Sequence, residues 1–327
     1  MVHLRIVAPE AEAKKALALF EKTDSVYNVI VLENAARKPE GHAILCDVAR
    51  EDASVVIADL KEMGIHHCGS IAIEDIDSQI SDVAIAAEKA AAGLPTDAVV
   101  WEEVEARTSE NVELSGNFLA FMVVATLIAA VGLLTDQVIL IIGAMVVGPE
   151  FGPLAGLCVA LVHKRSDMVK RSILALAVGF PLAIICAFVM TLLLDLAGLV
   201  PDGFSQESHR LTEFISSPDE FSVIVAALAG VAGILSLTAA KSGALIGVLI
   251  SVTTLPAAAN IGIAVALGDT KEGLGSLAQL AINLTVIVLS GVATLYFQRK
   301  LYIRRKAEHH SDEGRKAAGL SSTPQKS

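Results

Sequence analysis

Long apolar runs fill most of the chain after residue 116. They cover six segments: 118–134, 138–162, 173–200, 222–239, 243–267 and 277–297. The length of each segment is close to the value of about 20 residues that a helix needs to cross a bilayer. The pattern therefore predicts a polytopic α-helical membrane domain over residues 117–298, with these segments as its six spans.

The first part of the chain shows shorter runs with a different period. Alternating or β-branched runs predict strands at 3–7, 26–32, 42–48 and 69–75, and amphipathic runs predict helices at 9–22 and 51–63. Their order, βαββαβ, is that of a ferredoxin-like α+β domain, which we expect over residues 1–78. We expect a helical connector at 79–116 and a basic, disordered tail at 299–327.

Composition supports this division of the chain. Hydrophobic residues make up 54% and charged residues 19%, and the mean hydropathy is +0.61. Soluble domains carry about 25% charged residues, so a two-domain cytosolic enzyme is excluded. Residues 1–115 hold 22 acidic and 10 basic side chains, which leaves no basic face for a nucleic-acid partner. The expected partner is the lipid bilayer.

The basic residues predict the orientation of the spans. Thirteen of them lie on one predicted side, in the loop 163–172, at Lys241 and in the tail from Arg299, whereas only Arg210 and Lys271 lie on the other side. Basic residues accumulate on the cytoplasmic side of membrane proteins. We therefore expect a multi-pass protein of the inner membrane, with both termini and the ferredoxin-like domain in the cytoplasm.

Two of the predicted spans contain helix-breaking residues near their middles. Span two carries Gly148, Pro149, Gly152 and Pro153, and span five carries Pro256. Each half of the domain has three spans, and the run at 124–134 resembles the run at 225–235, so an inverted 3+3 repeat is predicted. Matching breaks in two inverted halves are typical of a transporter binding site. The alternative is that the breaks only bend or pack the helices.

Glu150 is the ionisable residue placed deep within a predicted span. An unpaired charge at mid-membrane costs about 3 kcal/mol on insertion scales, so this carboxylate must be protonated, paired or exposed to a wet cavity. Each of these states suits a site for protons or cations. Two alternatives stay open: Glu150 caps the backbone N–H groups of 151–154, or the break is re-entrant and lies nearer the surface.

Other uncharged polar residues complete the candidate binding set. The set consists of Gly148, Pro149, Glu150, Gly152, Pro153, Thr253, Thr254, Pro256, Asn260 and Asn283. No Ser/His dyad, H-E-x-x-H sequence or phosphate-binding loop is present, so an enzyme is not expected. We expect no cofactor and no metal site, since the four cysteines form no C-x-x-C pair and His66-His67-Cys68 is typical of a turn.

The run LLTDQVILIIGAMVVGPEFGPLAGL at 133–157 resembles the signature of the domain-of-unknown-function 389 family of bacteria and archaea. Gly143, Ala144 and Met145, followed by the P-x-x-G-P at 149–153, carry the resemblance. It extends over about residues 75–300 and includes the acidic connector around Trp101. The resemblance implies a soluble region before a hydrophobic domain and implies no particular activity. It also implies an apolar residue at position 150 in many members, where this chain has Glu150.

The sequence thus favours a membrane transporter or channel for a small solute or ion, bound between spans two and five and regulated through the cytoplasmic domain. The alternative is a membrane-tethered sensor or regulatory scaffold that acts through the ferredoxin-like domain. The identity of the solute and the coupling ion stay open, and a homo-oligomer is compatible with either function.

Overall fold

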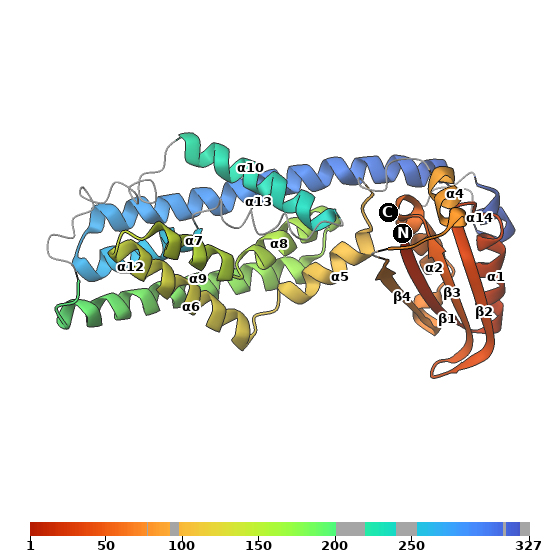
Figure 1. The fold of residues 1–327 in the computed structure, drawn as a ribbon, viewed down its shortest axis with the longest axis horizontal. Coiled ribbons are helices and arrows are strands. Elements are labelled where there is room, and N and C mark those ends of the chain that lie inside the picture. The colour runs from red at the N-terminus through yellow and green to blue at the C-terminus, as the bar shows by residue number, and fades with distance from the viewer. Residues whose placement is uncertain (77, 92–97, 201–219, 240–253, 310–311, 321–327) are drawn as a thin grey trace. The chain divides into compact units, whose positions relative to one another are not determined.

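The computed structural model describes residues 1–76, 78–91, 98–200, 220–239, 254–309 and 312–320 (Figure 1). The chain forms two compact units, one of Met1–Val104 with Gln298–Ser327 and one of Glu105–Phe297. We call the first the terminal unit, because it contains both ends of the chain. We call the second the membrane unit, because it contains most of the long apolar helices.

A four-stranded antiparallel sheet forms the centre of the terminal unit. Its strands are β1 (Val2–Ala8), β2 (Val26–Arg37), β3 (Glu40–Val48) and β4 (Ser70–Asp75), in the spatial order β2-β3-β1-β4. Helix α1 (Glu10–Phe20) connects β1 to β2, and α2 (Arg50–Glu62) with the short α3 (Ile65–Cys68) connects β3 to β4. This is the βαββαβ order that the sequence predicts, with α3 added before the last strand.

Alternation along β1 explains how the sheet forms a core. Val2, Leu4, Ile6 and Ala8 are all buried, whereas the residues between them are partly or fully exposed. The apolar faces of α1 and α2 join this row in one hydrophobic cluster. Removal of this continuous apolar surface from water is the main contribution to the stability of such a small unit.

The end of the chain differs from the disordered tail expected from residue 299. Helix α13 (Thr270–His309) extends into this region, and α14 (Glu313–Ala317) follows it. Arg315 is buried, pairs with Asp59, and donates from Nη2 to Glu62 at 2.9 Å. His309 Nε2 lies 2.8 Å from Asp59 Oδ2. Composition alone indicated a solvated basic segment, because these acidic partners are on α2, far away in the sequence.

The connector is helical, as predicted, and contains α4 (Asp82–Ala90) and α5 (Trp101–Asn111). Trp101 is buried within the terminal unit, and its ring centroid lies 6.1 Å from that of Tyr302. Its backbone N–H donates to Ser54 Oγ at 2.9 Å. Trp101 therefore packs inside this unit.

The membrane unit is helical. Its helices are α6 (Gly116–Leu134), α7 (Val138–Val147), α8 (Phe151–His163), α9 (Ser166–Leu196), α10 (Glu220–Thr238), α12 (Thr254–Leu267) and the larger part of α13. Among the described residues, four helices are long and apolar enough to cross a membrane: α6, α9, α10 and α13. The bent pair α7 and α8 makes five if it crosses as one span. The chain therefore has the apolar helices of a membrane protein.

The six predicted spans stay a prediction, since the described residues contain four long apolar helices, or five with the bent pair. Helix α12 falls in predicted span five but has 14 residues, fewer than the about 20 that a crossing requires. The earlier part of that predicted span, 243–253 with Thr253, lies outside the described residues. The inverted repeat stays a prediction.

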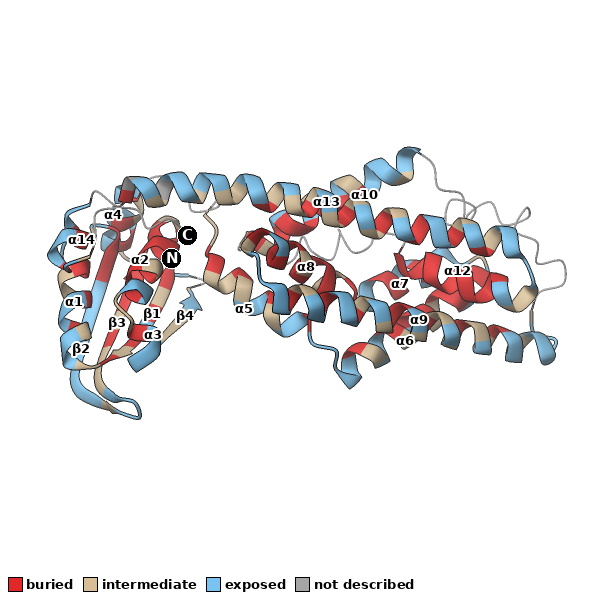
Figure 2. Cartoon of the chain, turned by 180° about the vertical axis from the view of Figure 1, so that it is seen from behind, coloured by how far each residue is buried: buried red, intermediate tan, exposed pale blue. Residues whose placement is uncertain are grey.

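Helix α12 is enclosed by the membrane unit. Every residue from Thr254 to Ala264 is buried, as the red colour of this helix in Figure 2 illustrates. It packs against α6, α7 and α9. A Cβ on Gly262 would lie 2.8 Å from Ala187 Cβ, so glycine permits the close approach of α12 to α9. Small residues commonly allow such contacts between membrane helices.

Candidate functional site

The predicted break in span two lies between α7 and α8. Gly148, Pro149 and Glu150 separate two helices that are bent by 49°. Pro149 has no backbone N–H and interrupts the hydrogen-bond ladder. The ladder resumes when the Leu154 N–H donates to the Glu150 carbonyl at 3.3 Å. The local sequence therefore sets the direction change and places Glu150 at the start of α8.

Glu150 occupies the cap position of α8, yet its side chain makes no capping hydrogen bond. Its Oε1 accepts a hydrogen bond from Thr254 Oγ1 at 3.0 Å. The residue is only 4% exposed, and among the described residues its buried Oε2 has no hydrogen-bond partner. The alternative of Glu150 as a helix cap is therefore wrong. Its carboxylate is directed to another helix instead.

This hydrogen bond joins the two segments in which the sequence predicts breaks. Thr254 is the first residue of α12, and Pro256 lies in the first turn, where a missing N–H is tolerated. Thr254 and Pro256 are both buried. The residues that lie against the break in span two are thus those at the predicted break in span five, although 104 positions separate Glu150 from Thr254.

Gly148 is required by the space beside this carboxylate. A Cβ on Gly148 would lie 2.4 Å from Glu150 Oε2 and 2.1 Å from Leu255 Cδ1. Oε2 is the carboxylate oxygen that has no hydrogen-bond partner among the described residues, and Leu255 belongs to α12. A larger residue at 148 would displace Glu150, Leu255 or both. The lack of a side chain at Gly148 therefore allows the end of α7, the start of α8 and the start of α12 to pack together.

A cavity of about 340 Å³ adjoins the break. The backbone region of Gly148, Pro149 and Gly152 lines one side of it, and the segment between α5 and α6 lines another. That segment contributes the polar residues Thr108, Glu110, Asn111, Glu113 and Ser115. The lining contains two carboxylates and no basic residue, so its charge favours a cationic or hydrogen-bond-donating solute.

The predicted site residues fall into two groups in the structure. Gly148, Pro149, Glu150, Gly152 and Thr254 lie at the break or at its contact with α12, and Pro153 is buried in α8. Asn260 bonds to Glu272 and Ser276, and Asn283 bonds to Gln279, in a region apart from the Glu150–Thr254 contact. One predicted site therefore corresponds to two neighbouring polar regions of the same unit.

Sequence reasoning missed three members of the second group. Glu272, Ser276 and Gln279 lie on α13 with Asn283, at spacings of four, three and four residues. This spacing places them on one helix face, and the same spacing was readable in the sequence. Glu272 and Ser276 lie before residue 277, where the predicted span begins, so the predicted span did not contain the whole pattern.

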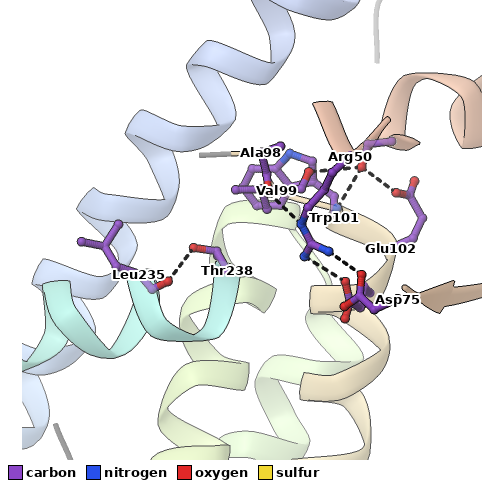
Figure 3. A network of polar contacts seen from close by, with 10 residues as sticks. Arg50, Asp75, Ala98, Val99, Trp101, Glu102, Leu235 and Thr238 are labelled. Atoms are coloured by element: carbon purple, nitrogen blue, oxygen red, sulfur yellow. Dashed lines mark hydrogen bonds and ion pairs between the residues drawn. The ribbon is translucent and has the colours of Figure 1, made fainter. Parts of the chain in front are cut away.

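The polar contacts of the terminal unit differ from those at the break. Arg50 pairs with Asp75, and its Nη2 donates to Glu103 at 3.2 Å (Figure 3). Its Nε donates to the Ala98 carbonyl at 3.4 Å. Beside it, Ser54 donates to Glu102 at 2.9 Å. The charged groups of this network are paired with one another, and these contacts hold α5 and β4 against α2.

A small α+β unit joined to apolar helices, with a broken helix pair at a buried carboxylate, defines a multi-span membrane protein that has a compact non-membrane part. Residues 145–289 match the family model described as "Domain of unknown function (DUF389)". The resemblance predicted from the sequence is thereby confirmed over that part of the chain. The match begins at Met145 and includes the break, α9, α10 and α12.

An uncharacterized protein of Methanocaldococcus jannaschii is 27% identical to the chain over 194 residues. The aligned segment covers 59% of this chain and 58% of that relative. The chain thus matches somewhat less than two thirds of the relative's length. No solved structure matches the chain.

Proposed function

We propose that the chain is a membrane transporter or channel for a small solute or ion, which binds where the break between α7 and α8 meets the start of α12. The contact between Glu150 and Thr254 carries the proposal. A buried carboxylate with one satisfied and one unsatisfied oxygen is costly in apolar surroundings. A bound cation, a proton or a solute donor at Oε2 would remove that cost.

The cavity beside the break supports the same function. Pro149 removes a backbone donor, and interrupted helices are tolerated in membranes where they face protein, water or a solute. The cavity of about 340 Å³ is lined by Gly148, Pro149 and Gly152 from the break, whereas Glu150 and Thr254 are not among its lining residues. It has the size of a small-molecule site. Its acidic lining supports a cationic species as the transported one.

Both chain ends belong to the terminal unit, which supports the predicted common side for them. An even number of crossings must then separate residue 104 from residue 298. The bent pair and α12 satisfy this in two ways: both cross the membrane with the four long helices, or neither does. In both cases the bent pair and α12 either cross the membrane together or stay out of it together, as two matching broken segments would. The excess of basic residues assigns the common side to the cytoplasm.

Charge movement in reconstituted liposomes tests this function. The full-length protein would be exposed to concentration jumps of NaCl, KCl, MgCl2, choline chloride and neutral amino acids on a solid-supported membrane. We expect at least one of these to give a current with wild-type protein. Glu150→Gln should abolish it, and Thr254→Val should reduce it about tenfold, the loss expected for one hydrogen bond to a charged group.

Matched variants separate the site from general damage. Glu220→Gln changes an exposed carboxylate at the start of α10, and Thr126→Val removes a buried hydroxyl that bonds only to Met122 of its own helix. Both should keep the wild-type current. Loss of current in these controls, or an unchanged current in Glu150→Gln, contradicts binding at the break.

A specific observation also supports the sensor alternative. In the terminal unit, α1, β2 and α4 border a cavity of about 760 Å³, which is lined by apolar residues such as Leu17, Phe20 and Val26 and by polar residues such as Glu21 and Asp24. Such a mixed lining fits an amphipathic ligand. Hydrogen exchange of the full-length protein distinguishes the two functions: a solute that protects α1 and α4 acts as a regulator, whereas one that protects α8 and α12 acts at the break.

A further inference from the structure

A row of polar side chains follows one face of α13 inside the apolar membrane unit. Glu272, Ser276, Gln279 and Asn283 are spaced by four, three and four residues and therefore lie on one face. Ser276, Gln279 and Asn283 are each at most 2% exposed. The row spans twelve residues, and about 16 Å of helix separate its two ends. Polar residues this deeply buried between membrane helices mark a solute or ion site more often than residues at helix ends do.

Asn260 of α12 completes the row from the opposite helix. Its Nδ2 donates to Glu272 Oε1 and to Ser276 Oγ, both at 2.8 Å. One turn further along α13, Gln279 Nε2 donates to Asn283 Oδ1 at 3.3 Å. The Asn260 amide, the Glu272 carboxylate and the Ser276 hydroxyl thus form one group between α12 and α13, and the amides of Gln279 and Asn283 form a pair one turn further along α13.

Gln279 shows that these hydrogen bonds leave the region incomplete. Its Oε1 is buried and has no hydrogen-bond partner among the described residues. If the row served only to hold helices together, its buried oxygens would be expected to have donors. A buried, unpaired oxygen atom one helix turn from both Ser276 and Asn283 is available to a cation instead.

The chemistry of the row selects the kind of cation. All its candidate ligands are amide, hydroxyl or carboxylate oxygens, which bind hard cations. The row holds one carboxylate, and in the part of the chain that the structure describes no group of three or more His, Cys, Asp or Glu side chains could hold a metal. A monovalent cation is neutralised by one carboxylate. A divalent cation would leave a net positive charge in apolar surroundings, which is costly.

We propose that Asn260, Glu272, Ser276 and Gln279 form a binding site for a monovalent alkali cation, of which Na⁺ is the first to test, and that Asn283 positions the Gln279 side chain. The site is separate from Glu150 but shares α12 with it. Thr254 and Asn260 are six residues apart on this helix, about 9 Å along its axis. A cation held by Asn260 would fix α12, and with it the Thr254 hydroxyl that bonds to Glu150.

Thermal unfolding of the full-length protein in nanodiscs tests the site directly. NaCl would be titrated against choline chloride at constant ionic strength, with KCl as a second alkali salt. We expect a saturable rise in the unfolding temperature with NaCl or KCl and none with choline chloride. Gln279→Leu should raise the apparent Kd of the alkali cation at least tenfold. Thr285→Val, on the exposed face of α13, should leave the Kd unchanged.

A second variant keeps the test decisive if Gln279→Leu fails to fold. Glu272→Gln alters a partly exposed residue in the first turn of α13 and should also raise the apparent Kd at least tenfold. Equal responses to NaCl, KCl and choline chloride, or wild-type titrations of both variants, overturn the proposal.

Glu150→Gln separates this proposal from the proposed function. If it keeps the alkali response while the currents are lost, the cation binds at the row and the two sites are distinct. If the response is lost in Glu150→Gln and retained in Gln279→Leu, the cation binds at the break. The second outcome overturns the site on α13 and leaves the proposed function intact.

Discussion

Two arginine networks of the terminal unit and two buried oxygens of the membrane unit are satisfied in opposite ways. In the terminal unit, the buried Arg50 and Arg315 are each paired with two carboxylates. In the membrane unit, Glu150 Oε2 and Gln279 Oε1 are buried without a hydrogen-bond partner among the described residues. Closed networks stabilise one arrangement of elements, whereas incomplete ones are available to a ligand. The comparison therefore assigns a structural role to the two arginine networks and a binding role to the two unpaired oxygens.

The largest effect is expected from breaking a closed network. Arg50→Met leaves Asp75 and Glu103 without their guanidinium partner, and removal of one member of a buried ion pair costs about 3–5 kcal/mol. We expect a lower unfolding temperature and faster hydrogen exchange in β4 and α5. Denaturant unfolding of the full-length protein measures the cost.

Lys14→Met provides the control for this loss. Lys14 pairs with Glu10 on the surface of the same unit, where both side chains are mostly exposed, so its removal should have little effect. If Arg50→Met were as stable as Lys14→Met, the network around Arg50 would not be a structural one.

The opposite sign is expected at the break. Glu150→Met replaces the buried carboxyl by an apolar side chain of similar length, and removal of an unsatisfied buried polar atom recovers about 1–3 kcal/mol. Thr254 loses an acceptor in this variant, so Glu150→Met with Thr254→Val should be the more stable protein. Thermal unfolding in the absence of added solute measures the gain.

The same variants should lose the currents described above, since stability and binding are in conflict at such a site. A marked destabilisation by Glu150→Met combined with Thr254→Val would show that the carboxylate supports the fold. The contrast between the two units would then fail.

The sequence predicted most of the terminal unit and the local break, because short-range patterns determine both. Alternation in β1 and the two prolines around Glu150 act within a few residues. The end of the chain was predicted poorly, because Arg315 is ordered by Asp59, a residue that is 256 positions away. The pairing of Glu150 with Thr254 was expected only as a meeting of two breaks. The hydrogen bond itself depends on the tight contact at Gly148.

The smallest effect on stability is expected at Glu51, a buried carboxylate of the terminal unit that lies outside the two arginine networks. This carboxylate at the start of α2 belongs to the terminal unit but forms no ion pair among the described residues. Burial raises the pKa of Glu51 above its usual value, and the carboxylates of Glu88 and Asp52 add to the rise. A backbone hydrogen bond and the N-terminal amino group act in the opposite direction.

The sign of the pH dependence follows from this raised pKa. The native state binds the Glu51 proton more tightly than the unfolded state, in which the pKa is about 4.3, so stability is lost as the pH rises from there through the raised native pKa. Glu51→Gln should therefore stabilise the protein at pH 8 and have no effect at pH 3.5, as measured by unfolding at both values. If Glu51→Gln stabilised the protein equally at both pH values, the charge of Glu51 would not be the cause of the stabilisation. Burial of the ionised Glu51 would then cost no more than burial of the paired carboxylates in the same unit.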